Sequence, residues 1–167
     1  LGCGIIAKII ARKKFNSGEE QFFIAGLLHD IGRLILLKDY PKVMTNIIVD
    51  SRQKQVPLYS AETEMLGFDH TDILGLLLPV WNFPANLQQI INYHHSPKSS
   101  RSSLRAAVVH AADAMTNAFE IGSSAEYFVP PISSDLWRSL GLSEGSIENI
   151  INQADRQIDE SVQLFFE

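Results

Sequence analysis

Apolar residues recur at intervals of three and four along almost the whole of this chain of 167 residues. The segment that begins at Leu1, for example, carries Ile5, Ile6, Ile9 and Ile10. That spacing lines one face of an α-helix, and no convincing run alternates apolar and polar residues as a half-buried strand does. The pattern therefore predicts an all-α fold, a single-domain helical bundle of eight or nine helices.

Capping and helix-stop residues set the expected helix limits. Asp69 is placed to cap a helix that starts at His70, and Gly67 just before it is a helix stop. Ser17 and Glu20 have the spacing of a capping box at the start of another helix. The helices are expected at about 1–14, 17 into 29–30, 39–53, 57–66, 70 to at least 77, 84–94, 103–121, 134–140 and 143–166.

The composition is that of an ordinary globular domain, with 46% apolar and 20% charged residues. A net charge of -5 with 14 basic residues argues against a nucleic-acid surface, because such surfaces neutralise phosphates. The longest apolar runs, Phe22–Leu28 and Ile73–Val80, are far shorter than the roughly 20 residues that span a bilayer. We therefore expect neither a nucleic acid nor a membrane as a partner.

The beginning of the chain supports two further expectations. Cys3 is the single cysteine and cannot form an internal disulfide, which fits a reducing, cytoplasmic location. Leu1 stands where an initiator methionine would, and the apolar helical pattern starts at once without a capping residue. We expect residues 1–167 to be one helical domain from a longer protein whose N-terminal part is missing.

All five histidines lie near an acidic residue or another histidine. Several lie within apolar helical segments, where an unpaired charge is costly. A metal ion or a closed hydrogen-bond network would satisfy them, and helical bundles build metal sites from inward side chains on facing helices. The clusters are His29-Asp30, Asp69-His70, His94-His95 and His110-Ala-Ala-Asp113.

Five stretches of the chain carry a family resemblance. They are Gly26-Leu-Leu-His-Asp-Ile-Gly-Arg33, Glu64-Met-Leu-Gly-Phe-Asp-His70, Leu77-Leu-Pro-Val-Trp-Asn-Phe-Pro84, Tyr93-His-His95 and Val109-His-Ala-Ala-Asp113. With these stretches, the chain up to about Phe119 resembles the HD superfamily of phosphohydrolases and, within it, the HDOD output domains of bacterial signalling proteins. The resemblance implies a helical bundle of the HD-domain type.

The resemblance also implies a site. In catalytic relatives, one or two divalent metals activate a water molecule for attack on a phosphoester. The ion could be Fe, Mn, Ni, Zn or Mg, and His110 would support the site from outside. The implied metal ligands are His29, Asp30, His70, His94, His95 and Asp113. The implied catalytic residues are His29, Asp30 and Arg33.

Simpler roles stay open for some of these residues. Arg33 lies four residues after His29 on the same helical face, so it could instead form a salt bridge with a nearby carboxylate. His94 and His95 stand at a helix end, where histidines also act as solvated caps. His70 could owe its place only to the start of its helix.

Three departures from the catalytic pattern keep the function open. No residue from Leu1 to Lys14 is expected to replace the first-helix histidine of catalytic relatives. Arg33 stands for a lysine of the phosphodiesterase branch, and Ser96-Pro-Lys-Ser-Ser100 replaces that branch's Gly-Tyr-Pro loop.

Three hypotheses follow. The first is a regulatory domain that contacts signalling proteins or other domains of the same longer chain. The second is an active metal-dependent phosphohydrolase that binds a nucleotide or cyclic dinucleotide. The third is a polar network with a purely structural role.

Overall fold

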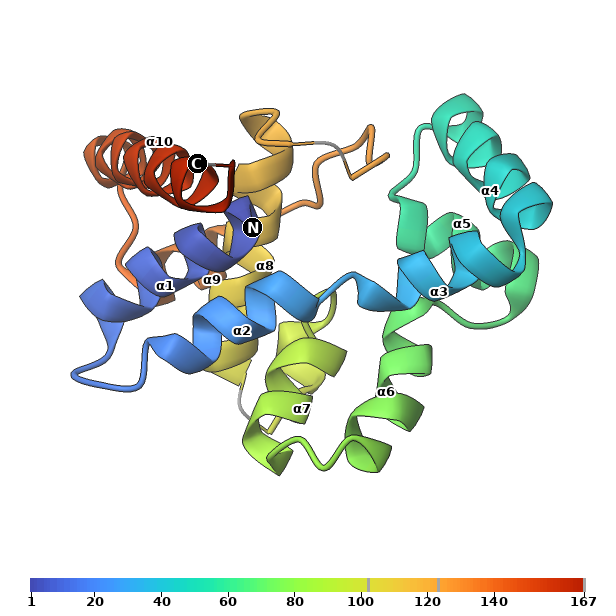
Figure 1. Ribbon diagram of the computed structural model, residues 1–167, viewed down its shortest axis with the longest axis horizontal. Helices are drawn as coiled ribbons and strands as arrows, with labels where there is room; N and C mark the ends of the chain where they lie inside the picture. The colour runs from blue at the N-terminus through green and yellow to red at the C-terminus, as the bar shows by residue number, and fades with distance from the viewer. Residues whose placement is uncertain (102, 123, 167) are drawn as a thin grey trace.

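The computed structural model describes residues 1–101, 103–122 and 124–166, and these residues form helices and loops without a β-strand (Figure 1). The all-α fold is therefore confirmed. The helices are α1 (Gly2–Lys14), α2 (Glu20–Leu28), α3 (Ile31–Asp39), α4 (Pro41–Lys54), α5 (Leu58–Leu66), α6 (His70–Val80), α7 (Ala85–Asn92), the short 3-10 helix η1 (Pro97–Ser99), α8 (Ser103–Ala118), α9 (Ser134–Leu140) and α10 (Glu144–Phe166).

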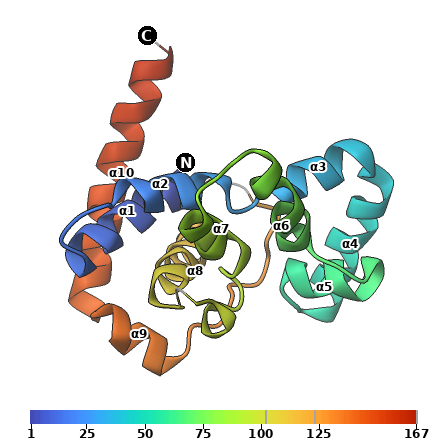
Figure 2. The same ribbon diagram turned by 90° about the horizontal axis from the view of Figure 1, so that it is seen from below.

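The helices pack around two separate hydrophobic cores. The larger core draws residues from α1, α2, α6, α7, α8, α9 and α10, and we call this part the large lobe. The helices α3, α4 and α5 form a small lobe, which lies to one side in both views (Figures 1 and 2). The core of the small lobe consists of Leu36, Met44, Ile47, Leu58 and Ala61.

The structure contains one helix that was not expected, α3 between Ile31 and Asp39. His29 keeps a helical backbone, but Asp30 leaves it with φ -104° and ψ 7°. The preceding helix therefore ends near His29-Asp30 as expected, but a new helix starts at once at Ile31, where none was predicted before Asp39. As a result, His29 and Asp30 occupy a junction between the two lobes.

Of the two expected helix caps, the one at Asp69 is present and forms a capping box. The Asp69 carboxylate accepts hydrogen bonds from the backbone N–H groups of Thr71 and Asp72, and the Asp72 carboxylate accepts one from the N–H of Asp69. The predicted box at Ser17 is wrong, because α2 starts only at Glu20 and has no side-chain cap. The cap at Asp69 fixes where α6 begins and therefore where His70 lies.

Two glycines allow the helices around the junction to approach closely. A Cβ atom on Gly26 would lie 2.8 Å from the carbonyl oxygen of Cys3, so α1 and α2 could not pack as they do. A Cβ atom on Gly32 would overlap the carbonyl oxygen of His70. These contacts explain why glycine stands on both sides of the His29-Asp30 pair.

The last helix packs on the larger core through apolar residues between Ile147 and Ile158. Ile150 and Ala154 are fully buried, whereas Val162 near the end of α10 is 43% exposed. In Figure 2 the end of α10 extends past the other helices. No helix in the described ranges combines the length and apolarity that crossing a bilayer requires.

Candidate metal centre

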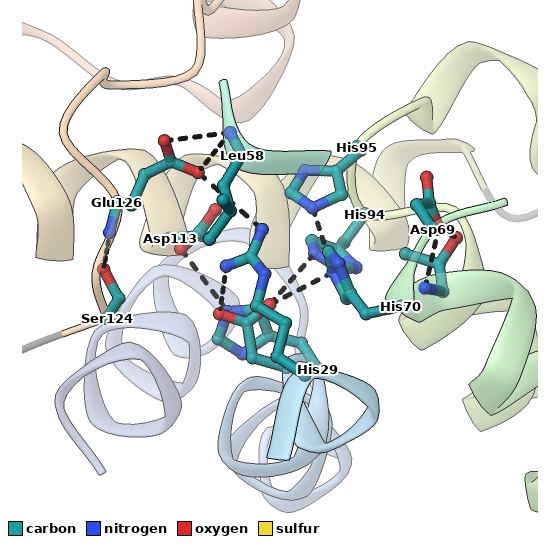
Figure 3. Close-up of polar contacts among 12 residues, drawn as sticks. His29, Leu58, Asp69, His70, His94, His95, Asp113, Ser124 and Glu126 are labelled. Atoms are coloured by element: carbon teal, nitrogen blue, oxygen red, sulfur yellow. Dashed lines mark hydrogen bonds and ion pairs between the residues drawn. The ribbon is translucent and has the colours of Figure 1, made fainter. Parts of the chain in front are cut away.

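All six expected ligand side chains meet at the junction between the lobes (Figure 3). They come from the α2–α3 junction, the first residue of α6, the segment just after α7, and α8. Their nitrogen and oxygen atoms form two groups, and within each group all chosen atoms lie within 4.8 Å of one another. One group is Asp30, His70, His94 and His95, and the other is His29, His94 and Asp113.

The closest contacts in the two groups are between imidazole nitrogens and carboxylates. His70 Nε2 lies 3.1 Å from Asp30 Oδ1, and His94 Nε2 lies 4.0 Å from the same oxygen. His29 Nε2 lies 3.4 Å from Asp30 Oδ2 and 3.4 Å from Asp113 Oδ1. Ligand atoms around one ion stand at most about 4.2 Å apart when each bond is about 2.1 Å. Small side-chain movements would therefore close either group around an ion.

Three histidines present the same ring nitrogen to the centre because a fixed partner holds the other one. The Nδ1–H of His29 donates to the carbonyl of Gly26 at 2.8 Å, and that of His94 donates to the carbonyl of Ile91 at 2.7 Å. The Nδ1–H of His70 donates to the buried carboxylate of Glu62 at 2.6 Å. Each Nε2 is thus oriented as metal-binding histidines usually are.

The donor set fits a divalent metal. Nε2 of His29 and of His94 are buried and have no hydrogen-bond partner among the described residues. Neutral nitrogen and carboxylate oxygen donors in this proportion suit borderline transition metals. A buried polar atom left without a partner is costly, and a bound cation would remove that cost.

Burial and the neighbouring charges determine whether His94 and His29 are protonated. Burial, together with nearby His29 and His70, lowers the pKa of His94 to about 3 and leaves its ring neutral at pH 7. Burial also opposes charge on His29, but Asp30, Cys3 and Asp113 together outweigh it and raise the pKa of His29 well above the usual range. Without a metal, His29 therefore carries a proton that a metal would have to displace.

Arg33 lies beside the centre and faces three carboxylates. Its Nη1 donates to Asp30 at 2.8 Å, its Nε donates to Glu62 at 3.0 Å, and its Nη2 lies 3.7 Å from Glu126. Burial opposes the charge of Arg33, but the carboxylates, Asp30 first, raise its pKa. This arrangement matches the salt-bridge alternative for Arg33, and its expected catalytic role stays a prediction.

Glu62 and Glu126 are the residues that sequence reasoning missed. One oxygen of Glu62 accepts from Arg33, while the other accepts from both the ring and the backbone N–H of His70. Both oxygens of Glu126 accept from the backbone N–H of Leu58, at the start of α5. Neither glutamate stands in a histidine cluster, so no local signal marked them.

His95 and His110 differ in position. His95 Nε2 lies 3.1 Å from His70 Nε2, and its ring stacks on Tyr59 with centroids 4.2 Å apart. His110 faces the carbonyl of Pro131 at 3.3 Å and belongs to neither group. His110 therefore lies outside the centre, which fits the supporting position expected for it.

The first helix brings one side chain to the centre after all. Cys3 is buried beside His29 and lines the same cavity as His29 and Asp113. Burial raises the pKa of its thiol, while neighbouring His29 acts in the opposite direction. Cys3 is not within either ligand group. The helix α1 therefore contacts the site through Cys3.

Comparison with known proteins identifies the family. The sequence model of the HDOD domain family matches residues 1–97. This match spans more than half of the chain and includes five of the six expected ligands. The chain belongs to the HDOD domain family. An uncharacterized protein of Treponema pallidum (strain Nichols) is 27% identical to this HDOD chain over 74 residues, which make up 44% of the chain.

Solved structures share the fold. An HDOD domain protein of unknown function from Geobacter sulfurreducens matches 96% of the chain with a TM-score of 0.71 and 24% identity. A proposed signal transduction protein from Marinobacter aquaeolei matches 98% with a TM-score of 0.75 and 19% identity. A proposed phosphohydrolase from Shewanella amazonensis matches 92% with a TM-score of 0.64 and 23% identity.

The chain spans only part of these relatives. It covers 14% of the Treponema protein and 57%, 36% and 58% of the three solved chains, in the order given above. The shared features are therefore the HDOD fold and its helical architecture.

Proposed function

We propose that this chain is a regulatory HDOD domain of a bacterial signalling protein, and that it keeps a divalent metal centre of the HD type. The observation that carries the proposal is the set of carboxylates that the guanidinium group of Arg33 contacts. Its Nη1 and Nε donate to Asp30 and Glu62, and its Nη2 lies 3.7 Å from Glu126 without a hydrogen bond, so its charge is already shared among three carboxylates of the protein and is not reserved for a substrate phosphate. The Marinobacter relative, described as a proposed signal transduction protein, supports the same function.

In this proposal the ligands of the metal ion are His29, Asp30, His70, His94, His95 and Asp113. The signal passes through contacts with other signalling proteins or with other domains of the same longer chain. The domain would work in the cytoplasm as a single helical unit. The metal is Fe, Mn, Ni, Zn or Mg, and elemental analysis of the purified protein would identify it.

The test compares metal content, turnover and partner capture. The metal-replete protein should show no turnover on a broad panel of phosphoesters. His29→Ala should lose the metal and still capture the same partners, provided that circular dichroism shows a folded protein. Turnover that disappears in His29→Ala, or the absence of any partner that depends on this domain, would contradict the proposal.

A second function, metal-dependent hydrolysis of a phosphoester, is supported by a different observation. The two ligand groups share His94, and a cavity of about 740 Å³ borders the group of His29 and Asp113. A bound divalent cation would lower the pKa of a water molecule and polarise a phosphoryl oxygen. His29, Asp30 and Asp113 would hold it, and Arg33 would keep Asp30 in place.

The hydrolase proposal predicts metal-dependent turnover of a nucleotide or cyclic dinucleotide. Activity should fall to background in both His29→Ala and Asp30→Ala. His110→Gln is the matched control, because His110 is a buried histidine outside the two groups. Equal activity in His29→Ala and in the unchanged protein would show that the activity comes from a contaminant.

A further inference from the structure

The cavity beside the metal centre has an unusual lining. It lies between α1, α2, α3, α4 and the end of α8, and its volume of about 740 Å³ is in the range of small-molecule sites. Three leucines that line it are well exposed to solvent, Leu27 at 48%, Leu34 at 63% and Leu37 at 39%. Other aliphatic residues continue the lining, namely Ile31, Met44, Ile48, Leu58, Ile121 and Ile158.

The inner end of the cavity is polar. It is lined by His29, Asp30, Arg33 and Asp113, and Asp30 is the partly exposed member, with 24% of its side chain accessible. The cavity therefore changes from an aliphatic mouth to a site that binds cations. A ligand that fills it should have a hydrocarbon body and a head that coordinates a metal.

The lining gives little support to a nucleobase. None of the described residues that line the cavity is a phenylalanine, tyrosine or tryptophan, so a base would find no large ring to stack on. The amide of Asn117 could read a base edge, but its nitrogen already donates to Asp113 and its oxygen accepts from Ser124. Leucine, isoleucine and methionine instead provide the flexible aliphatic surface that an acyl chain would contact.

We propose that this cavity binds an anionic amphiphile, an unbranched alkyl chain that ends in a carboxylate or a phosphate. The chain lies along Leu27, Leu34 and Leu37, and the head lies at the metal centre. This inference rests on the metal centre of the proposed function. Without a metal, the cations of Arg33 and His29 are already paired with Asp30 and Asp113 and leave no free positive charge for the head, so binding should require the metal.

Binding of decanoate and of decyl phosphate, each below its micelle concentration, tests the proposal by calorimetry. Both probes carry an anionic head, and their relative affinities distinguish a carboxylate ligand from a phosphate ligand. The metal-loaded protein should bind at least one of them, and the metal-free protein should bind neither. Across hexanoate to dodecanoate, or the matching alkyl phosphates, the Kd should fall about fourfold per added methylene.

Two variants and one control ligand make the test specific. Leu34→Glu should weaken binding about tenfold or more, because it places a charge beside the alkyl chain. Leu76→Glu is the matched control, since Leu76 is 76% exposed on α6 and lies outside the cavity lining. Decyltrimethylammonium has the same chain with a cationic head and should not bind.

Three results would overturn the proposal. They are no dependence of affinity on chain length, an equal loss in Leu34→Glu and Leu76→Glu, and binding of guanosine monophosphate with no binding of either amphiphile. Metal content measured on the same samples separates this inference from the proposed function. A protein that holds metal but binds neither amphiphile contradicts only the inference, whereas a protein that holds no metal contradicts the centre itself.

Discussion

The buried polar layer between the two lobes has two halves that differ in how their charges are satisfied. In the arginine half, Arg33 donates hydrogen bonds to Asp30 and Glu62, and its Nη2, which makes no hydrogen bond among the described residues, lies 3.7 Å from Glu126. In the imidazole half, His29 and His94 each have a buried Nε2 without a hydrogen-bond partner among those residues. The charge of the first half is balanced by close carboxylates within the protein. The second half presents two ring nitrogens that a bound cation would take as ligands.

This difference separates two kinds of variant. Changes in the arginine half should mainly alter the stability of the fold, whether or not metal is present. Changes in the imidazole half should mainly alter metal binding. Asp30 and Glu62 belong to both halves, because each contacts Arg33 and His70.

The largest effect is expected for Arg33→Ala. Removing the cation leaves Oε1 of the buried Glu62 carboxylate without its donor and Asp30 without its closest cation, and breaking a buried pair in this way costs about 3–5 kcal/mol. Denaturant unfolding of the metal-free protein would measure the loss. Arg33→Lys is the control, because it keeps the charge but lacks the forked donors, and it should recover part of the stability. A loss below about 1 kcal/mol would show that the arginine half is not structural.

The next effect concerns His94, which both ligand groups share. His94→Ala should weaken metal binding by more than about a hundredfold. Even the loss of a residue that only orients a ligand lowers metal affinity by about 10–100-fold. Metal titration followed by calorimetry would measure the change. His110→Gln, the control outside the centre, should keep its metal affinity and lose only about 1 kcal/mol of stability. Equal metal affinities in the two variants would remove His94 from the centre.

Glu62→Gln tests the connection between the halves. The amide keeps the size of the side chain, but its oxygen no longer offers a charge to the Nδ1–H of His70. Metal affinity should fall about 10–100-fold through the weaker orientation of His70. The same titration measures it, and an unchanged affinity would mean that His70 is not a ligand.

The pH dependence of metal binding gives the smallest effect. The raised pKa of His29 stabilises the metal-free fold below the unfolded value near 6.5, and this contribution is lost as the pH rises through the folded value. Because the metal must displace that proton, metal affinity should rise with pH, about tenfold per unit for each proton displaced. Calorimetry in two buffers of different ionisation enthalpy would count the protons. Affinity that falls with rising pH would contradict this account.

The helices and the histidine clusters could be predicted because both depend on residues that are close together in the sequence. The spacing of apolar residues repeats every turn of a helix, and the cap of α6 at Asp69 needs only its next three residues. The helix α3 was missed because it is only nine residues long and follows directly on the end of α2. The box at Ser17 was predicted wrongly because the first turn there is not helical.

The sequence alone determined the all-α class, most helix limits and the set of histidines and aspartates expected at the metal centre. The tertiary structure decided which other side chains surround these ligands. Glu62 lies 29 residues from Arg33, and the pairing depends on which faces of α3 and α5 meet. Glu126 and Cys3 likewise reach the centre only through packing. A buried charge is satisfied by whichever group lies within a few ångströms, and separation along the chain does not encode that distance.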